Sequence, residues 1–247
     1  MVSPCRAANH FLADRFAVPG SVALSRKGRG ENKMYLKQLQ LGPMQNFVYL
    51  VGDDEAKKAV VIDPAWEVGR IFKTAEEDGM TLTGALVTHS HFDHTNGIAA
   101  LLEKQDMPVY AHKKEAEFAK LGSPLLGDLG KHVKPVEGGD RLSVGKVEIE
   151  FVHTPGHTPG SQCFLVRNRL LSGDTLFIGG CGRCDLPGGD PEEMYKSLRS
   201  LSKLPSETVL YPGHDYGPAP VRPLSEEALE NPYLKVQSMR EFLGMVG

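Results

Sequence analysis

Short apolar runs separated by turns rich in Gly, Pro and Asn follow one another along most of this chain. Runs of about four to eight residues bounded by turns are typical of β-strands, and apolar residues that recur every three to four positions indicate helices. This pattern predicts strands at 34–41, 46–52, 59–64, 84–88, 107–111, 146–153, 162–166, 170–177 and 208–214. It predicts helices at 68–79, 95–105, 113–121, 190–204 and 231–243.

Two local features carry turn or cap signals of their own. Asp190 suits the N-cap of the helix 190–204, with Pro191 at its first position and Glu193 at capping-box spacing. Asn168 and Arg169 predict a tight turn between two strands.

The first 33 residues differ from the rest of the chain. They lack a sustained period and carry a net charge of +4, against −7 for the remainder, from the total of −3. We interpret residues 1–33 as a disordered tail or an upstream extension of the reading frame; the alternative is an organellar transit peptide, which is typically rich in Arg and poor in acids. One folded domain is expected over 34–247.

The composition of this chain of 247 residues, with 40% hydrophobic content, is that of a soluble protein. It contains no apolar run of the roughly 20 residues that span a bilayer, so no membrane association is expected. The cysteines are too few and too unevenly spread for a disulfide framework, which favours a reducing, cytoplasmic location, or an organellar matrix if residues 1–33 are a transit peptide. They are Cys5, Cys163, Cys181 and Cys184.

Polar residues with metal-binding side chains recur where a strand-like run ends. These residues are His89 and His91, His157, Asp174 and His214. Because the ends of neighbouring strands in one sheet meet at the same edge, we expect these side chains to converge.

The spacing within THSHFDHTNG, residues 88–97, suits two adjacent ions. In an extended segment side chains alternate, so His89 and His91 point the same way, whereas Asp93 and His94 come round as the chain turns into a helix. Imidazole and carboxylate ligands suit zinc, iron or manganese. The alternatives are surface histidines or a closed structural site, but structural zinc favours cysteine ligands.

Other histidines and cysteines that could bind a metal lie outside this motif. His153 is interpreted as a residue that supports the site or is simply packed, and no motif surrounds His112 or His132. Cys181 and Cys184 form a C-x-x-C that could serve redox or zinc chemistry, but without a second pair we interpret it as part of a loop at the pocket wall.

Four motifs together resemble those of the metallo-β-lactamase superfamily. THSHFDH matches its H-x-H-x-D-H signature, and TPGHTPG, SGDTLF and YPGHDYG follow in the expected order over roughly residues 34–233. The resemblance implies an α/β fold of the four-layer αββα sandwich type, with metals at one edge. It implies His89, His91 and His157 as ligands of the first metal, Asp93, His94 and His214 as ligands of the second, and Asp174 as the bridging carboxylate.

The implied cofactor is a pair of zinc ions, and the implied chemistry is attack on a carbonyl carbon by metal-bound hydroxide that Asp93 orients. The absence of a G-x-S-x-G nucleophile motif agrees with this. GRCDLPGGDPEEMYKSL and YPGHDYG resemble the glyoxalase II branch, which implies a thioesterase for hydroxyacyl-thiol substrates. The alternative is a persulfide dioxygenase, a close relative that holds one iron through two histidines and one aspartate; mixed zinc, iron or manganese occupancy is also open.

Substrate recognition is less well determined by the sequence. Only 33 residues follow His214, fewer than the helical C-terminal domain that contacts glutathione in longer glyoxalase II proteins. Arg183 is a candidate for binding a substrate carboxylate, with a surface arginine as the alternative. A small-molecule thioester or glutathione-derived thiol is therefore the expected partner, and homo-oligomerisation stays open.

Two other classes of function are alternatives to such an enzyme. A nuclease of this superfamily would need a basic face, which the negative charge of 34–247 disfavours. A non-catalytic metal-binding module is the remaining alternative.

Overall fold

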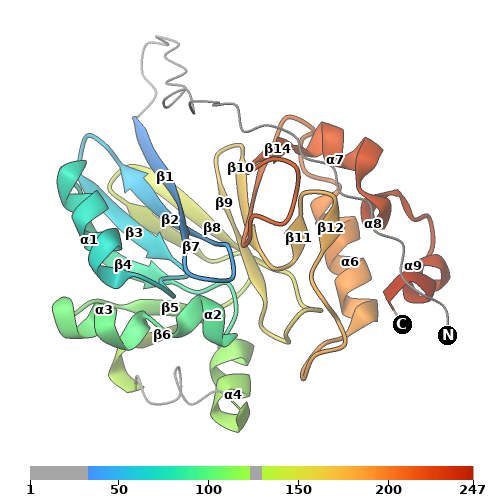
Figure 1. The fold of residues 1–247 in the computed structure, drawn as a ribbon, viewed down its shortest axis with the longest axis horizontal. Coiled ribbons are helices and arrows are strands. Elements are labelled where there is room, and N and C mark those ends of the chain that lie inside the picture. Colours follow the sequence, from blue (N-terminus) through green and yellow to red (C-terminus); the bar gives the residue numbers. More distant parts are fainter. Residues whose placement is uncertain (1–32, 123–129, 247) are drawn as a thin grey trace, which may run out of the picture. The chain divides into compact units, whose positions relative to one another are not determined.

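The computed structural model describes residues 33–122 and 130–246. The predicted tail or transit peptide, apart from Lys33, lies outside these residues. Figure 1 shows the described chain as two β-sheets with helices on the outer side of each. Within the described residues, no helix has the length and apolar character needed to cross a membrane.

The first sheet has the strand order β1-β2-β3-β4-β5-β6. β1, β2 and β3 pair antiparallel, and β3 to β6 pair parallel. The strands are β1 (Met34–Leu41), β2 (Asn46–Asp53), β3 (Lys58–Ile62), β4 (Thr81–Leu86), β5 (Val109–His112) and β6 (Val133–Val136). The helices between them are α1 (Val68–Glu77), α2 (Phe92–Thr95), α3 (Ile98–Lys104) and α4 (Lys113–Gly122), with a 3₁₀ turn at Gly130–His132.

The second sheet has the order β14-β13-β10-β9-β8-β7, and β11 and β12 form a separate hairpin. Its strands are β7 (Arg141–Val144), β8 (Val147–His153), β9 (Gln162–Val166), β10 (Arg169–Gly173), β13 (Val209–Pro212) and β14 (Arg222–Pro223), and the hairpin is β11 (Leu176–Phe177) and β12 (Gly180–Cys181). The helices are α6 (Pro191–Leu201), α7 (Leu224–Glu230), α8 (Pro232–Lys235) and α9 (Met239–Val246).

Alternation along the strands explains why both sheets are buried on both faces. In β2, Phe47, Tyr49 and Val51 point into the core between the sheets, whereas Val48 and Leu50 point toward the helices. Burying a large apolar side chain contributes roughly 1.5–3 kcal/mol, so a strand with two apolar faces is stable only when layers cover both.

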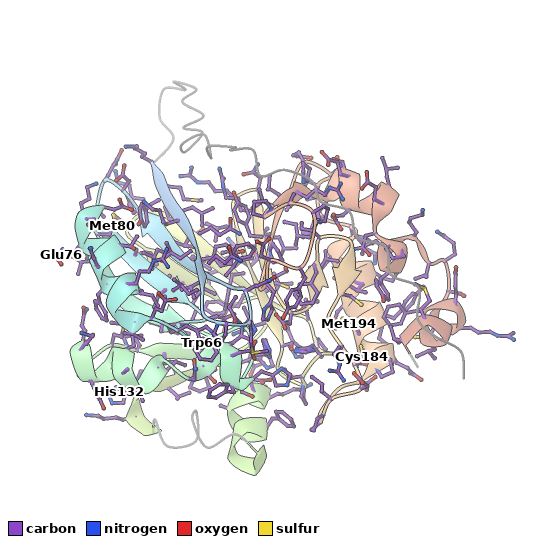
Figure 2. All side chains as sticks on the ribbon, in the orientation of Figure 1. Trp66, Glu76, Met80, His132, Cys184 and Met194 are labelled. Atoms are coloured by element: carbon purple, nitrogen blue, oxygen red, sulfur yellow. The ribbon has the colours of Figure 1, made fainter. Side chains whose placement is uncertain are left out.

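The outer helices complete the four layers. Ile71 of α1 packs with Met80 beside the first sheet, and Leu198 of α6 packs with Met194 beside the second. Figure 2 places Met80 and Met194 on these two sides. The predicted αββα sandwich is confirmed.

Two segments that were predicted as single continuous helices are interrupted in the structure. Of the segment 95–105, Ile98–Lys104 forms α3, whereas Thr95 ends α2 and residues 96–97 form a turn between the two helices. The backbone of Gly97 lies against Pro64, and a Cβ there would come within 2.2 Å of the Pro64 carbonyl oxygen. The segment 231–243 is split between α8 and α9, since Val236 is extended at φ −59° and ψ 138°. The local pattern of apolar residues does not indicate either interruption.

Two further predictions need smaller corrections. The turn between β9 and β10 lies at Arg167 and Asn168, one residue earlier than predicted, since Arg169 already pairs with Val166. Arg167 occupies the left-handed region with φ +56°. The helix predicted over 190–204 ends at Leu201.

The predicted start of α6 is confirmed. The Asp190 carboxylate accepts hydrogen bonds from the backbone N–H of Glu192 at 2.9 Å and Glu193 at 3.0 Å, with Pro191 at the first position. The Glu193 carboxylate binds Lys196 at 2.7 Å.

Candidate metal centre

The candidate ligands come together at one end of the sandwich, but from both sheets. His89 and His91 follow β4 of the first sheet, whereas His157, Asp174 and His214 follow β8, β10 and β13 of the second. The prediction that they share the edge of one sheet was therefore wrong. Three groups of side chains that could each hold a metal ion are His89 with His91 and His157, His89 with His94 and Asp174, and Asp93 with His94 and His214.

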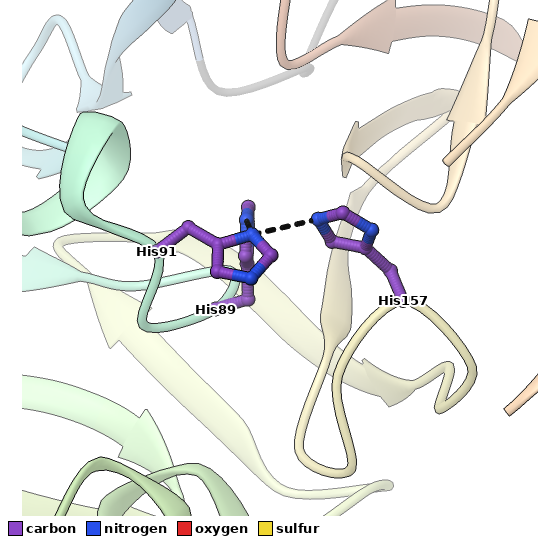
Figure 3. Close-up of side chains that lie close together, drawn as sticks. All are labelled: His89, His91 and His157. Atoms are coloured by element: carbon purple, nitrogen blue, oxygen red, sulfur yellow. Dashed lines mark hydrogen bonds between the residues drawn. The ribbon is translucent and has the colours of Figure 1, made fainter. Parts of the chain in front are cut away.

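The first group is a triad of facing imidazoles, His89, His91 and His157 (Figure 3). His91 Nδ1 lies 3.0 Å from His89 Nε2 and 2.9 Å from His157 Nε2. Two nitrogen ligands bound tetrahedrally about 2.1 Å from one zinc ion lie about 3.4 Å apart, so these separations are close to those of a shared ion.

The second group is Asp93, His94 and His214. His94 Nε2 lies 3.1 Å from His214 Nε2, and Asp93 Oδ2 lies 3.3 Å from His214 Nε2. The Asp174 carboxylate reaches both groups, because Oδ1 lies 3.3 Å from His94 Nε2 and Oδ2 lies 3.7 Å from His157 Nε2. Asp174 thus has the position of a bridge between the two groups.

Hydrogen bonds on the far side of each ring fix which nitrogen faces the centre. Three rings place Nδ1 beside an oxygen that can only accept: His157 beside the Arg183 carbonyl (2.8 Å), His214 beside the Met44 carbonyl (2.9 Å) and His94 beside the Asp63 carboxylate (2.9 Å). Each Nδ1 therefore carries the proton, and Nε2 faces the site. Such outer partners orient metal-binding histidines in many proteins.

The sequence analysis missed two residues that hold the candidate ligands in place, Asp63 and Asn46. Asp63 accepts hydrogen bonds from the Thr88 N–H and hydroxyl at 2.7 and 2.6 Å as well as from His94. Asn46 donates to Asp93 Oδ2 at 3.1 Å and accepts from Trp66 Nε1 at 2.9 Å. Asp63 directly follows β3, so its position at a strand end was the signal that could have revealed it.

Burial and charge divide the histidines into two kinds. Burial, reinforced by neighbouring histidines, lowers the pKa of His89 well below its usual value and that of His91 to about 4. Burial also opposes charge on His94, but Asp174 and Asp63 outweigh it and raise the pKa of His94 well above its usual value. Without a cation, His89 and His91 are therefore neutral, and His94 holds a proton that a metal ion would displace.

The donor atoms fit a bound cation. The Thr88 hydroxyl donates to Asp63 and therefore accepts a hydrogen bond from His89 Nδ1, at 3.0 Å. His89 Nε2 is then left with a lone pair and no proton. His157 Nε2 is in the same position, because its Nδ1 donates to the Arg183 carbonyl. A proton on His91 Nδ1 can satisfy only one of them, whereas a metal ion satisfies all three nitrogens. Asp174 Oδ1 is also buried without a hydrogen bond from the described residues. Nitrogen and carboxylate donors of this kind suit zinc, iron and manganese.

Arg183 contacts the centre through its backbone. Its carbonyl holds His157, whereas its guanidinium is 67% exposed and binds both oxygens of Asp185 at 2.8 and 2.9 Å. The role of the guanidinium as a substrate contact stays a prediction.

The two cysteines of the C-x-x-C segment lie outside the ligand groups. Burial raises the pKa of the Cys181 thiol to about 12 and that of Cys184 to about 11, and neither belongs to a possible metal cluster of the described chain.

The remaining described histidines lie outside the ligand groups. His153 stacks on His112 with ring centroids 4.0 Å apart, and its Nε2 donates to the Pro159 carbonyl at 3.0 Å. His153 thus packs beside the loop of His157. His132 Nδ1 lies 3.1 Å from Asp106 Oδ1.

The fold and this cluster define a metal-dependent enzyme on an αββα sandwich. A model of the metallo-β-lactamase superfamily matches residues 41–214, and the chain belongs to this superfamily.

Relatives of this chain carry two different activities. The chain is 34% identical over 201 residues to hydroxyacylglutathione hydrolase of Idiomarina loihiensis, covering 79% of this chain and 74% of the relative. It is 33% identical over 228 residues to the mitochondrial persulfide dioxygenase ETHE1 of Homo sapiens, covering 91% and 85%. The crystal structure of ETHE1 from Myxococcus xanthus aligns with a TM-score of 0.76 at 34% identity, covering 86% of this chain and 89% of that one.

Proposed function

We propose that this protein is a two-metal hydrolase of hydroxyacyl thioesters, with zinc as its metal. The observation that carries the proposal is the paired centre: two groups of three ligands lie on either side of Asp174, whose two oxygens face both. In a two-metal hydrolase, adjacent cations activate water and stabilise the leaving group, and the complete second group supplies ligands for the second cation.

The residues divide the work of such a reaction. When bound, two ions supply a water of lowered pKa and positive charge for a leaving thiolate. Asp93 is held by Asn46 through both its backbone carbonyl and Oδ2, so its carboxylate is fixed to orient that water. Asp174 holds the two groups of ligands at a constant separation.

A one-iron persulfide dioxygenase is the second candidate. It is favoured by the extent of the likeness, because the chain covers 85% of the human dioxygenase but 74% of the hydrolase from Idiomarina loihiensis. In that reaction one ion would use His157, Asp174 and one of His89 and His91, and His94 would lie outside the coordination sphere.

Metal content and both activities of a His94→Ala variant distinguish the two candidates. In a two-metal hydrolase this variant should lose about one ion per chain and slow thioester hydrolysis by roughly 10²–10³, the usual cost of losing electrostatic stabilisation. The parent, His94→Ala and the control His132→Ala are reconstituted in parallel with zinc and with ferrous iron. A parent that consumes oxygen with a persulfide and fails on every thioester, together with a His94→Ala variant that keeps its metal, would overturn the hydrolase proposal.

A further inference from the structure

Glu115 is a buried carboxylate with four hydrogen-bond donors around it. It lies in the first turn of α4 and is 1% exposed. Its Oε1 accepts from the Ser90 N–H at 2.7 Å and the Ser90 hydroxyl at 2.6 Å. Its Oε2 accepts from the Thr158 hydroxyl at 2.8 Å and the Gly160 N–H at 2.9 Å. Each oxygen therefore binds a different loop.

Both loops carry candidate ligands of the first triad. Ser90 stands between His89 and His91, and Thr158 directly follows His157. The first loop follows β4 in one sheet and the second follows β8 in the other. Glu115 thus joins the two sheets at the point where the facing nitrogens of His91 and His157 lie 2.9 Å apart.

The contact is close enough to fix the position of the second loop. A Cβ added to Gly160 would lie 2.3 Å from the backbone nitrogen of Glu115, so this loop rests directly on the start of α4. Thr158 is further tied to Ser161, whose hydroxyl lies 2.7 Å from that of Thr158. A shift of the carboxylate would therefore displace the loop of His157 relative to the loop of His91.

We infer that Glu115 is a positioning residue that sets the metal affinity of the triad His89, His91 and His157. The inference rests on the metal-dependence of the proposed function but not on its substrate. A carboxylate can accept from both loops at once, whereas an amide offers one oxygen and one NH₂ group. Glu115→Gln can therefore keep one link, but its NH₂ group must then face a donor of the other loop.

The test is zinc binding by the full chain, measured by competition with a chromophoric chelator. Loss of an outer partner of a metal site typically weakens binding 10–100-fold, so Glu115→Gln should raise the Kd of one zinc ion by this factor. Thr158→Val, which removes one hydrogen bond to Oε2 and the contact with the Ser161 hydroxyl with little change of shape, should give a smaller loss in the same direction. Zinc affinity is measured without any substrate, so failure of the thioesterase proposal would leave this test intact.

Asp53→Asn is the matched control. Asp53 is also a buried carboxylate that joins two loops, because it accepts from the N–H groups of Glu55 and Ala56 and from that of Lys146 at 2.7 Å. It lies at the far end of β2 from Asn46, roughly 23 Å away at about 3.3 Å per residue. Asp53→Asn should lower the melting temperature and leave the zinc Kd unchanged.

The outcomes separate positioning from general stabilisation. A raised zinc Kd in Glu115→Gln and Thr158→Val, but not in Asp53→Asn, supports the inference. If Glu115→Gln does not fold, Thr158→Val alone decides in the same way. Unchanged zinc affinity in the folded variants, or an equal loss in Asp53→Asn, would overturn it and leave Glu115 with a role in stability alone.

Discussion

Single hydrogen bonds decide which atom each ligand presents to the centre. A neutral imidazole has one donor and one acceptor nitrogen, and an oxygen that only accepts forces the proton onto the nitrogen beside it. The carbonyls of Arg183 and Met44 act in this way on His157 and His214. The Nε2 atoms therefore face the site before any ion binds, which reduces the reorganisation that binding requires.

Asp174 should be the most sensitive carboxylate of the centre. Asp174→Asn keeps the shape of the side chain but removes the charge that faces both ligand groups. Metal affinity should fall by at least the roughly 10–100-fold that loss of a residue outside the coordination sphere typically costs, and turnover should fall with it. His153→Ala, which removes a ring packed beside the loop of His157, should have only a modest effect on either quantity. Metal analysis and turnover of the two variants make the comparison, and equal losses would contradict the assignment of Asp174.

The stacked pair of His112 and His153 should make stability depend on pH. Burial, reinforced by His153, lowers the pKa of His112 to about 4, whereas an unfolded histidine titrates near 6.5. Between these values the unfolded chain binds a proton that the folded chain does not, so the free energy of unfolding decreases as the pH falls.

His112→Gln removes this titration and should flatten the dependence. The free energy of unfolding is measured by urea titration of parent and variant at about pH 7 and pH 5, both with the metal chelated. The parent should lose more stability than His112→Gln over this interval. The same loss in both proteins would show that His112 does not titrate as described.

At the scale of elements, strand ends and helix starts place the chemistry. The parallel pair β10 and β13 delivers Asp174 and His214 to the same edge, since parallel strands end on the same side. α4 begins directly after β5 and so brings Glu115 between two ligand loops. α6 covers the outer face of the second sheet and also contacts the loop of His157, because the Asp190 N–H donates to the Gly156 carbonyl at 2.8 Å and the Ser197 hydroxyl to the Pro155 carbonyl at 2.7 Å. The Asp190 carboxylate takes no part in these two bonds, so we expect its loss to affect stability more than metal binding.

The N-cap of α6 gives a test of that division. Asp190→Ala removes the acceptor for two backbone N–H groups and should lower the free energy of unfolding by about 1 kcal/mol. Metal content should stay the same. Glu76→Ala, at an exposed position of α1, serves as a control that should change stability by less than about 0.5 kcal/mol. A loss of metal in Asp190→Ala would show that α6 supports the site directly.

At the scale of the whole molecule, the metal centre and the start of β1 lie at opposite ends of the β1–β2 hairpin. Met34 pairs with Asp53, whereas Leu41 pairs with Asn46, which holds Asp93. Events near residue 34 are therefore separated from the centre by the length of β2.

Residues 1–33 should be dispensable for metal binding and turnover. A chain that starts at Met34 loses the hydrogen bond from the Asp54 N–H to the Lys33 carbonyl and an ion pair between these residues, both away from the centre. Metal content and kcat/KM of the shortened and full-length chains should agree. Loss of either in the shortened chain would show that the segment contributes to the site. The alternative interpretation of this segment as a transit peptide needs a separate localisation experiment.

The amino-acid sequence by itself determined most strands and the identity of the candidate ligands. Period-two alternation records which faces are buried, and a histidine or aspartate directly after an apolar run marks a strand end. His89, His91, His157, Asp174 and His214 all carried this signal. The breaks near Gly97 and at Val236 carried no such signal, because the apolar pattern that predicted each helix continues through both positions.

Only the tertiary structure decided how the ligands are held. It joined strand ends of two sheets where the sequence predicted one, and it brought Asp63, Asn46 and Glu115 against the ligand loops. These contacts join residues far apart in the chain, and several use backbone carbonyls or N–H groups. Since nearly every residue has such groups, the sequence carries no mark of which ones will meet a histidine after folding.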